Sequence, residues 1–314
     1  MQRYRDYNSY LKEIFGERVQ KIPLDAGFSC PNRDGTISYT GCIYCNSRGS
    51  GTGAMAINNR PIDEQMGEGK KFAQRRYKAK KFIAYFQAFT NTHAPVQKLK
   101  ELYDQALQYD GVVGLSIGTR PDCIDEEILE LISSYQNKFN VWIEFGLQSA
   151  HDSTLKLIKR GHNSACFEKA VQITSKYNIN ICAHIILGLP VENREMMLDT
   201  ARFLAKLPIK GLKIHSPYIT KNTALAGMYK NNKYSIFSRE EYVNIAVDCL
   251  ELLPPNYIIQ RLTGDPDRSE LVAPNWALEK TDTLNMIKKR LEERDTWQGR
   301  KYKQSIAGKS NLTD

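Results

Sequence analysis

The feature that most constrains this chain is a regular alternation of short apolar runs and amphipathic helical stretches. The runs are rich in β-branched and aromatic residues, and they lie at residues 19–24, 81–89, 112–117, 140–147, 180–187 and 211–218. Near-continuous apolar runs are typical of parallel strands that are buried on both faces. Because strands that alternate with helices form βα units, the pattern predicts an α/β fold.

The number of these units favours a partial barrel. A complete eight-stranded barrel takes about 250 residues, whereas the six predicted units end near residue 220. We therefore expect a partial (β/α)6 TIM-type barrel over residues 1–222 and a helical C-terminal extension over residues 223–314. A doubly wound open sheet is the alternative. In either fold, ligands gather at the carboxyl ends of the strands.

Local signals predict several helix boundaries and the course of the extension. Asp125, Asn193 and either Asn163 or Ser164 are predicted as helix N-caps, because each precedes an apolar stripe at helical spacing. In the extension, we predict helices over 242–253 and 277–294, a long loop over 261–276, and a frayed tail over the last twenty residues.

The cysteines and the N-terminus indicate where the protein works. The chain has seven cysteines, an odd number that argues against a disulfide framework. The N-terminus lacks an apolar signal core, and no apolar run reaches the roughly 18 residues that cross a bilayer. We therefore expect a cytoplasmic protein with no membrane partner.

Three of the cysteines stand close together after the first predicted strand, in the loop 29–46. Cys30, Cys42 and Cys45 have the spacing C-x11-C-x2-C. Three thiolates can hold three irons of a 4Fe–4S cluster. The fourth iron then stays open for the amino and carboxylate groups of S-adenosylmethionine (SAM), and an electron from the cluster can cleave SAM to a 5′-deoxyadenosyl radical.

Two other interpretations of the cysteine loop remain, a structural zinc site and a purely structural cluster. A structural zinc ion normally has four ligands that come as two pairs. Here only one pair is present, and the nearest later histidine and cysteine are His93 and Cys123. The spacing therefore favours the iron–sulfur cluster over zinc, although a contact made in the fold could supply a fourth ligand.

Further motifs give the chain a resemblance to a known family. They lie at residues 29–35, 86–92, 116–122, 144–149, 184–190 and 215–218. Together with the cysteine loop, they resemble the radical SAM superfamily, in the branch close to the catalytic subunit of Elongator. More narrowly, the chain is similar to the stand-alone bacterial YhcC/YtqA-type family, over about residues 15–275.

The resemblance implies a role for the cysteine loop. The three cysteines would ligate the cluster, and Tyr44, inside the C-x2-C, would lie beside the adenine of SAM. Gly118 stands where related enzymes have an acidic residue, which puts that SAM contact in doubt for this chain.

The resemblance also implies SAM contacts from the strands. Thr90 and Asn91 would meet the amino group of SAM, Gln148 the ribose and Arg160 the carboxylate, and His184 occupies a strand position that is acidic in some relatives. Gln148 could instead cap a strand, Arg160 could be a surface residue, and His184 could be a satisfied core histidine. Gln148 follows a predicted strand directly, which is where a site belongs on this fold.

Two basic stretches indicate an anionic polymer as the partner. Residues 70–81 carry seven Lys or Arg side chains interleaved with Phe72 and Tyr77, and residues 201–239 carry eight and no acid. Basic side chains neutralise phosphates and aromatic rings stack on unpaired bases. With a formal net charge of +9, the chain is predicted to bind RNA, and a solvated basic surface is the alternative.

The resemblance implies the same class of partner. It implies an enzyme that acts on wobble uridine 34 of tRNA and converts a 5-carboxymethylaminomethyl group to 5-aminomethyl, with an electron donor such as flavodoxin or ferredoxin. Two alternatives stay open. One is a radical SAM enzyme that acts on a peptide or small metabolite, and the other is a non-catalytic, metal-stabilised RNA-binding module.

Overall fold

A curved parallel sheet forms the centre of the molecule. The computed structural model describes residues 2–49 and 60–303, and within these ranges seven parallel strands form one sheet in the order β1-β2-β3-β4-β5-β6-β8. The strands are β1 (Val19–Leu24), β2 (Lys81–Phe86), β3 (Val112–Thr119), β4 (Asn140–Gln148), β5 (Asn180–Ile186), β6 (Gly211–His215) and β8 (Ile258–Arg261). The six predicted strands are confirmed, and so is the α/β partial barrel.

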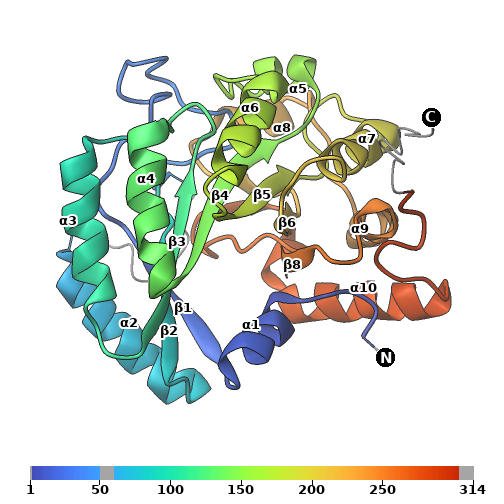
Figure 1. Ribbon diagram of the computed structural model, residues 1–314. Helices are drawn as coiled ribbons and strands as arrows, with labels where there is room; N and C mark the ends of the chain where they lie inside the picture. Colours follow the sequence, from blue (N-terminus) through green and yellow to red (C-terminus); the bar gives the residue numbers. More distant parts are fainter. Residues whose placement is uncertain (1, 50–59, 304–314) are drawn as a thin grey trace, which may run out of the picture.

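Helices surround this sheet, most of them on its outer side, one at its amino end and one at its carboxyl end (Figure 1). They are α1 (Tyr7–Phe15), α2 (Ile62–Tyr77), α3 (Val96–Leu107), α4 (Glu126–Ser134), α5 (Asp152–Leu157), α6 (Ser164–Ser175), α7 (Arg194–Leu204), α8 (Ala224–Lys230), α9 (Arg239–Leu252) and α10 (Lys280–Glu293). Two 3-10 turns, η1 (Tyr135–Asn137) and η2 (Asn275–Leu278), and an antiparallel pair, β7 (Ile219–Thr220) and β9 (Leu271–Ala273), complete the described elements.

Side-chain caps begin several of these helices where the sequence predicts them. Asp125, Asn163 and Asn193 each accept a hydrogen bond from the backbone N–H three residues later, at 2.9, 2.9 and 3.0 Å. Each bond satisfies an amide that has no partner within its helix. No helix in residues 2–49 and 60–303 combines the length and hydropathy that crossing a membrane requires.

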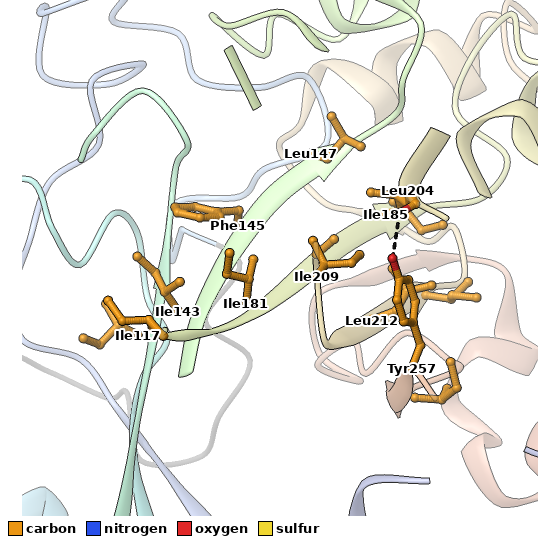
Figure 2. Close-up of a cluster of buried hydrophobic side chains, with 14 of the residues drawn as sticks. Ile117, Ile143, Phe145, Leu147, Ile181, Ile185, Leu204, Ile209, Leu212 and Tyr257 are labelled. Atoms are coloured by element: carbon orange, nitrogen blue, oxygen red, sulfur yellow. Dashed lines mark hydrogen bonds between the residues drawn. The ribbon is translucent and has the colours of Figure 1, made fainter. Parts of the chain in front are cut away.

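The outer face of the sheet is the main apolar core. Figure 2 shows Ile117 of β3, Ile143 and Phe145 of β4 and Ile181 of β5 among the buried side chains of this cluster. At its far side, the Tyr257 hydroxyl donates to the carbonyl oxygen of Leu204 at the end of α7, at 2.9 Å. This packing fixes the strands, so that their inward side chains have defined positions.

The inner face of the sheet is polar. Alternate residues of a strand point to opposite faces, and the positions between the core residues include Ser116, Glu144, His184 and Lys213, of which His184 alone is more than slightly exposed. Buried polar side chains of this kind require partners. The interior of the barrel therefore carries a hydrogen-bonded network in place of apolar layers.

The sheet curls until its two edge strands meet. Lys21 of β1 donates from Nζ to Oε1 of Gln260 in β8, at 2.9 Å, although the two residues are 239 positions apart. This contact crosses the interior and ties the first strand to the last. The partial barrel is therefore nearly closed at this level.

The segment after residue 222 differs from its predicted course in two places. β8 pairs with β6, so the segment expected to be a helical extension also contributes the last strand of the sheet. The expected frayed tail is wrong over 295–303, where Thr296 and Gln298 are buried and bonded to Glu251 and to the carbonyls of Pro254 and Tyr257. Residues 304–314 lie outside the described residues.

Candidate active site

A cavity opens at the carboxyl ends of the strands and brings most of the predicted site residues together. Residues from the cysteine loop, from the ends of β2 to β6 and from β8 line it. Of the predicted site residues, those that line it are Cys30, Cys42, Tyr44, Cys45, Thr90, Gln148, Arg160 and His184. Asn91 is the exception, because it lies behind the cavity wall.

Hydrogen bonds hold the cysteine loop in one shape. The side-chain amide of Asn32 donates to the carbonyl oxygens of Lys159 and Arg160, at 2.8 and 2.9 Å, and lies 3.4 Å from Sγ of Cys42. Arg33 donates to the backbone carbonyls of residues 45 and 46, at 2.8 and 2.6 Å. The loop is therefore tied to itself and to the turn after α5. An N–H group directed at a thiolate sulfur also shifts the reduction potential of a cluster that the sulfur holds.

Asp34 organises the other side of the loop. It accepts hydrogen bonds from the Ser29 hydroxyl at 2.6 Å, from both the N–H and the hydroxyl of Thr36, and from His93 at 2.9 Å. These bonds favour the ionised carboxylate, with Ser29 the largest contributor, and hold the pKa of Asp34 well below its usual range. Asp34 therefore links the loop to the end of β2, where His93 lies.

The three predicted cysteine ligands differ in their exposure at the cavity. Cys42 is 7% exposed and Cys30 and Cys45 are half-buried at the cavity wall. Within residues 2–49 and 60–303, no three His, Cys, Asp or Glu side chains converge closely enough to hold one metal ion. A tetrahedral zinc site requires such convergence. In a 4Fe–4S cube each cysteine ligates a different iron, so the three thiols have to border one cavity, as they do here.

The end of β4 shapes the adjoining wall. A register shift between Gly146 and Gln148 and a φ of +79° at Gln148 turn this side chain into the cavity. Arg160 is buried and donates from Nε and Nη2 to the carbonyl oxygen of Gly146, at 3.1 and 2.7 Å, and its Nη1 lies 3.8 Å from Sγ of Cys42. Arg160 is therefore an internal residue of the site and not a surface residue.

Gly146 is needed for this arrangement. A Cβ atom at this position would lie 2.6 Å from Nε2 of Gln148 and 2.7 Å from Nη2 of Arg160. Both distances are shorter than a van der Waals contact. Only glycine therefore leaves room for the two polar side chains beside the cysteine loop.

Thr90 and Asn91 follow β2 and differ in their access to the cavity. The N–H of Thr90 donates to the carbonyl oxygen of Ser29, at 3.2 Å, and its buried hydroxyl has no partner within the described residues. An unsatisfied buried hydroxyl costs about 1–3 kcal/mol, so a ligand in the cavity would satisfy it. Asn91 donates from Nδ2 to the carbonyl oxygen of Gly118, at 2.8 Å, and supports the end of β3.

A charge network that was not predicted forms the floor of the cavity. Glu144 accepts hydrogen bonds from Lys21 at 2.6 Å, from Lys213 and from His184 at 2.8 Å. Lys213 also donates to the Tyr85 hydroxyl at 3.0 Å. The sequence concealed this network because Glu144 and Lys213 each stand singly in an apolar run, where they break no pattern.

Electrostatics set the protonation states of this floor. Burial alone would raise the pKa of Glu144, but the charges of Lys21 and Lys213 and the hydrogen bond from His184 hold it well below its usual value. Burial and the charge of Lys213 lower the pKa of His184 to about 4, against the opposing effect of Glu144. At neutral pH His184 is therefore an uncharged imidazole that donates one N–H to an ionised carboxylate.

These positions fit the cofactors that the cysteine spacing predicts. Three thiols and an orphaned buried hydroxyl border one cavity, next to a wall that only glycine permits. Arg160, which the resemblance assigns to the SAM carboxylate, already has two hydrogen bonds to Gly146. Its remaining Nη1 group is the part that is directed at the cysteine loop.

Family models match two parts of the chain. The model described as "Radical SAM superfamily" matches residues 30–204, which is more than half of the chain, and the "Radical_SAM C-terminal domain" model matches residues 209–293. The first range begins at Cys30. The second contains β6 and β8, so the last strand of the sheet lies within the matched C-terminal region.

Individual relatives agree with these models. The chain is 41% identical to the protein YtqA of Bacillus subtilis over 99% of this chain and 96% of YtqA, and 37% identical to YhcC of Escherichia coli over 85% of each. It is 26% identical to the tRNA uridine(34) acetyltransferase of Methanocaldococcus infernus, over 49% of this chain and 29% of that protein.

The fold also matches solved structures. The archaeal Elp3 of Methanocaldococcus infernus, with an N-terminal deletion, superimposes with a TM-score of 0.67 at 16% identity, over 89% of this chain and 64% of that one. At this identity the match establishes the fold alone. With the family model over residues 30–204 and the relatives above, the chain belongs to the radical SAM superfamily, in the family of YtqA and YhcC, and is an enzyme that uses a 4Fe–4S cluster and SAM.

Proposed function

We propose that Cys30, Cys42 and Cys45 ligate the cluster, and that SAM lies against Tyr44, Thr90, Gln148 and Arg160, with Asn91 and His184 supporting this wall from behind and below. When bound, these cofactors supply a 5′-deoxyadenosyl radical that takes a hydrogen atom from the substrate. The cluster also needs an electron donor, and a small redox protein such as flavodoxin or ferredoxin fits this need. The side chains of the chain hold the reactants and exclude water.

We infer that the substrate is tRNA and that the enzyme converts the 5-carboxymethylaminomethyl group of wobble uridine 34 to 5-aminomethyl. The observation that carries this proposal is that one cavity holds more than the cofactor residues. Beyond them it continues to His184, His215, Tyr218 and Arg261, which leaves polar groups for a second molecule. A wobble base is unpaired and can be inserted into such a cavity without opening a duplex.

The similarity to a tRNA uridine(34) acetyltransferase supports the choice of tRNA. The shared part of that protein covers 29% of its length. We therefore carry over only the class of substrate and its modified position.

The position of the basic residues supports the same choice in part. α8 begins at the cavity mouth, where the N–H of Leu225 donates to the carbonyl oxygen of Ile43 in the cysteine loop, at 2.8 Å. Lys221, Lys230 and Lys233 flank α8 and are exposed, and we call these three residues the α8 rim. Phosphates near an inserted base would lie over them.

The first basic stretch does not support tRNA binding at the cavity. It forms the last turns of α2 and leads into β2 at Lys81, so it lies at the amino ends of the strands, opposite the cavity mouth (Figure 1). Lys71, Arg75 and Lys78 are exposed there, and we call them the α2 end. The prediction that this stretch contacts RNA stays a prediction, and it would require an RNA that extends beyond the cavity, because the chain enters a parallel strand at the edge away from the ligands.

The experiment that tests this function is mass spectrometry of tRNA nucleosides from cells with and without the gene. We expect 5-carboxymethylaminomethyl uridine to accumulate and 5-aminomethyl products to fall in the deletion strain, and the wild-type gene to reverse both changes. Complementation with an Arg18→Gln gene, altered at an exposed arginine directly before β1 at the amino end of the sheet, should also restore them. Unchanged nucleosides would contradict the proposal and favour a peptide or a small metabolite.

A further inference from the structure

Arg261 differs from the other arginines of the cavity. Four line it, and three of them are already bound to the protein: Arg33 to carbonyl oxygens of the cysteine loop, Arg120 to Asp122 at 2.6 Å, and Arg160 to Gly146. Arg261 stands at the end of β8, and within residues 2–49 and 60–303 its guanidinium has no hydrogen bond or ion pair. It faces the cavity with its donors free.

The charges around Arg261 do not balance within the described residues. Glu144 is the only acidic residue among those that line the cavity. Its carboxylate already binds Lys21 and Lys213, so Arg261 is a further basic side chain beside a single carboxylate, although burial lowers the pKa of Lys213 to about 7. Arg261 is half-buried, and a partly desolvated cation gains from a counter-ion. The floor of the cavity is therefore complementary to one further anion.

The neighbouring histidines agree with this excess of positive charge. The rings of His184 and His215 lie 5.5 Å apart between their centroids. Burial, then the charge of Arg261, hold the pKa of His215 well below its usual value, and burial with Lys213 lowers that of His184 to about 4. Both rings are uncharged at neutral pH because they are buried and because the neighbouring cations disfavour a further proton.

The position of Arg261 below the rim of the cavity favours one kind of anion. Arg261 is paired in register with Lys213, which is paired with His184, so it lies at the level of the charge network and below the rim. The sugar and phosphates of an inserted nucleotide stay nearer to the mouth. A substituent on the base reaches further, and a planar carboxylate matches the two parallel N–H groups of a guanidinium.

We propose that Arg261 binds a carboxylate of the substrate inside the cavity, namely that of the 5-carboxymethylaminomethyl group. This inference rests on the function proposed above and adds the residue by which the enzyme recognises its substituent. The carboxylate of SAM is the other source of the same chemistry, and Arg160 is the arginine beside the cysteine loop for it. Arg261 is therefore a specificity residue that separates an acidic substituent from a neutral one.

The test compares two RNAs on the cluster-loaded enzyme with SAM. One anticodon stem-loop carries 5-carboxymethylaminomethyl uridine, and the other carries its carboxamide. For Arg261→Gln, we expect kcat/KM on the acidic RNA to fall about 10- to 100-fold, the range for a charge-assisted hydrogen bond, and the amide to be nearly unaffected. Arg261→Lys keeps the charge but loses the planar fork, so it should recover part of the loss. Arg18→Gln, at an exposed arginine directly before β1 and outside both basic stretches, is the matched control with an unchanged ratio.

Binding measurements complete the test. The Kd for SAM and the absorption spectrum of the cluster should be the same in Arg261→Gln and in the wild type. If SAM binding weakens while the preference for the acidic RNA stays, the carboxylate is that of SAM and the inference is overturned. An equal loss on both RNAs would mean a structural role and also overturn it. If the wild type converts neither RNA, the proposed function itself fails, and this inference fails with it.

Discussion

The two ends of the sheet carry opposite kinds of residue, although both are built from the same strands. At the carboxyl end, loops hold cysteines and polar side chains around a cavity. At the amino end, the rings of Tyr7 and Tyr10 from α1 meet the ring of Trp142 edge-on, at 5.9 and 5.8 Å, and Trp142 is fully buried. Edge-to-face aromatic pairs add stability beyond the area that they bury. The amino end therefore stabilises the barrel, and the carboxyl end binds the ligands.

This difference shows that the role of a residue type depends on the end of the sheet at which it lies. Cysteines occur at both ends. Cys42 borders the cavity, whereas Cys182 packs below it, near Trp142, and is fully buried. Burial raises the pKa of the Cys182 thiol well above its usual value, which keeps it protonated and inert. The same holds for the basic residues, of which the α8 rim lies at the cavity mouth and the α2 end lies at the opposite end.

The largest effect should come from the same substitution made at each end. Cys42→Ala should abolish SAM cleavage, because a cluster with two protein ligands is not retained. Cys182→Ala should keep full cleavage and lose only about 1 kcal/mol of stability through a small cavity. Iron content after anaerobic reconstitution, 5′-deoxyadenosine yield and urea unfolding measure the three quantities. A Cys42→Ala protein that keeps its cluster and its SAM cleavage would break the comparison.

The sequence predicted the carboxyl end better than the interior. The apolar runs located six strands because parallel strands buried on both faces leave a strong local signal. The cysteine loop was also predictable from a local signal, since its three ligands lie within one short segment of the sequence. β8 was not predicted, because it has four residues and its pairing with β6 depends on curvature of the whole sheet.

The interior network and Arg261 were hidden for a related reason. Lys21, Glu144 and Lys213 come from three strands and meet only when the sheet curls. Glu144 and Lys213 are each a single polar residue in an apolar run, which a local pattern does not separate from a tolerated surface position. By contrast, the position of the α2 end can be predicted from the sequence, because residues directly before a parallel strand lie at its amino end.

An intermediate effect should come from His184, which lies between the two ends. Its pKa is about 4 in the folded protein, below the usual value of 6.5, so the unfolded chain binds the extra proton between these values. Stability should therefore fall as the pH falls from 6.5 towards 4. His184→Gln keeps a donor for Glu144 but does not titrate.

The measurement is anaerobic urea unfolding of both proteins at pH 6.5 and pH 5. We expect the wild type to lose about 1–2 kcal/mol more than His184→Gln over this interval. His215 keeps the same direction of dependence in both proteins, because burial and Arg261 also lower its pKa. Equal losses in the two proteins would mean that His184 is not held neutral by the cationic floor, and that the interior resembles an ordinary solvated site.

The smallest effect should come from charge reversals on the two basic surfaces, the α8 rim and the α2 end. These variants compare the two ends of the sheet directly. Reversing two charges of the α8 rim, Lys230→Glu with Lys233→Glu, should lower tRNA affinity about tenfold and reduce the slope of log K against log salt by about 2, because two phosphate contacts are lost. Reversing two charges of the α2 end, Lys71→Glu with Arg75→Glu, changes the net charge equally. It should leave the slope unchanged, since that surface lies at the opposite end of the sheet from the cavity. Filter binding from 50 to 200 mM salt measures both slopes. If the α2 variant loses as much affinity as the rim variant, tRNA extends over the whole molecule, and the amino end takes part in binding as well as in stability.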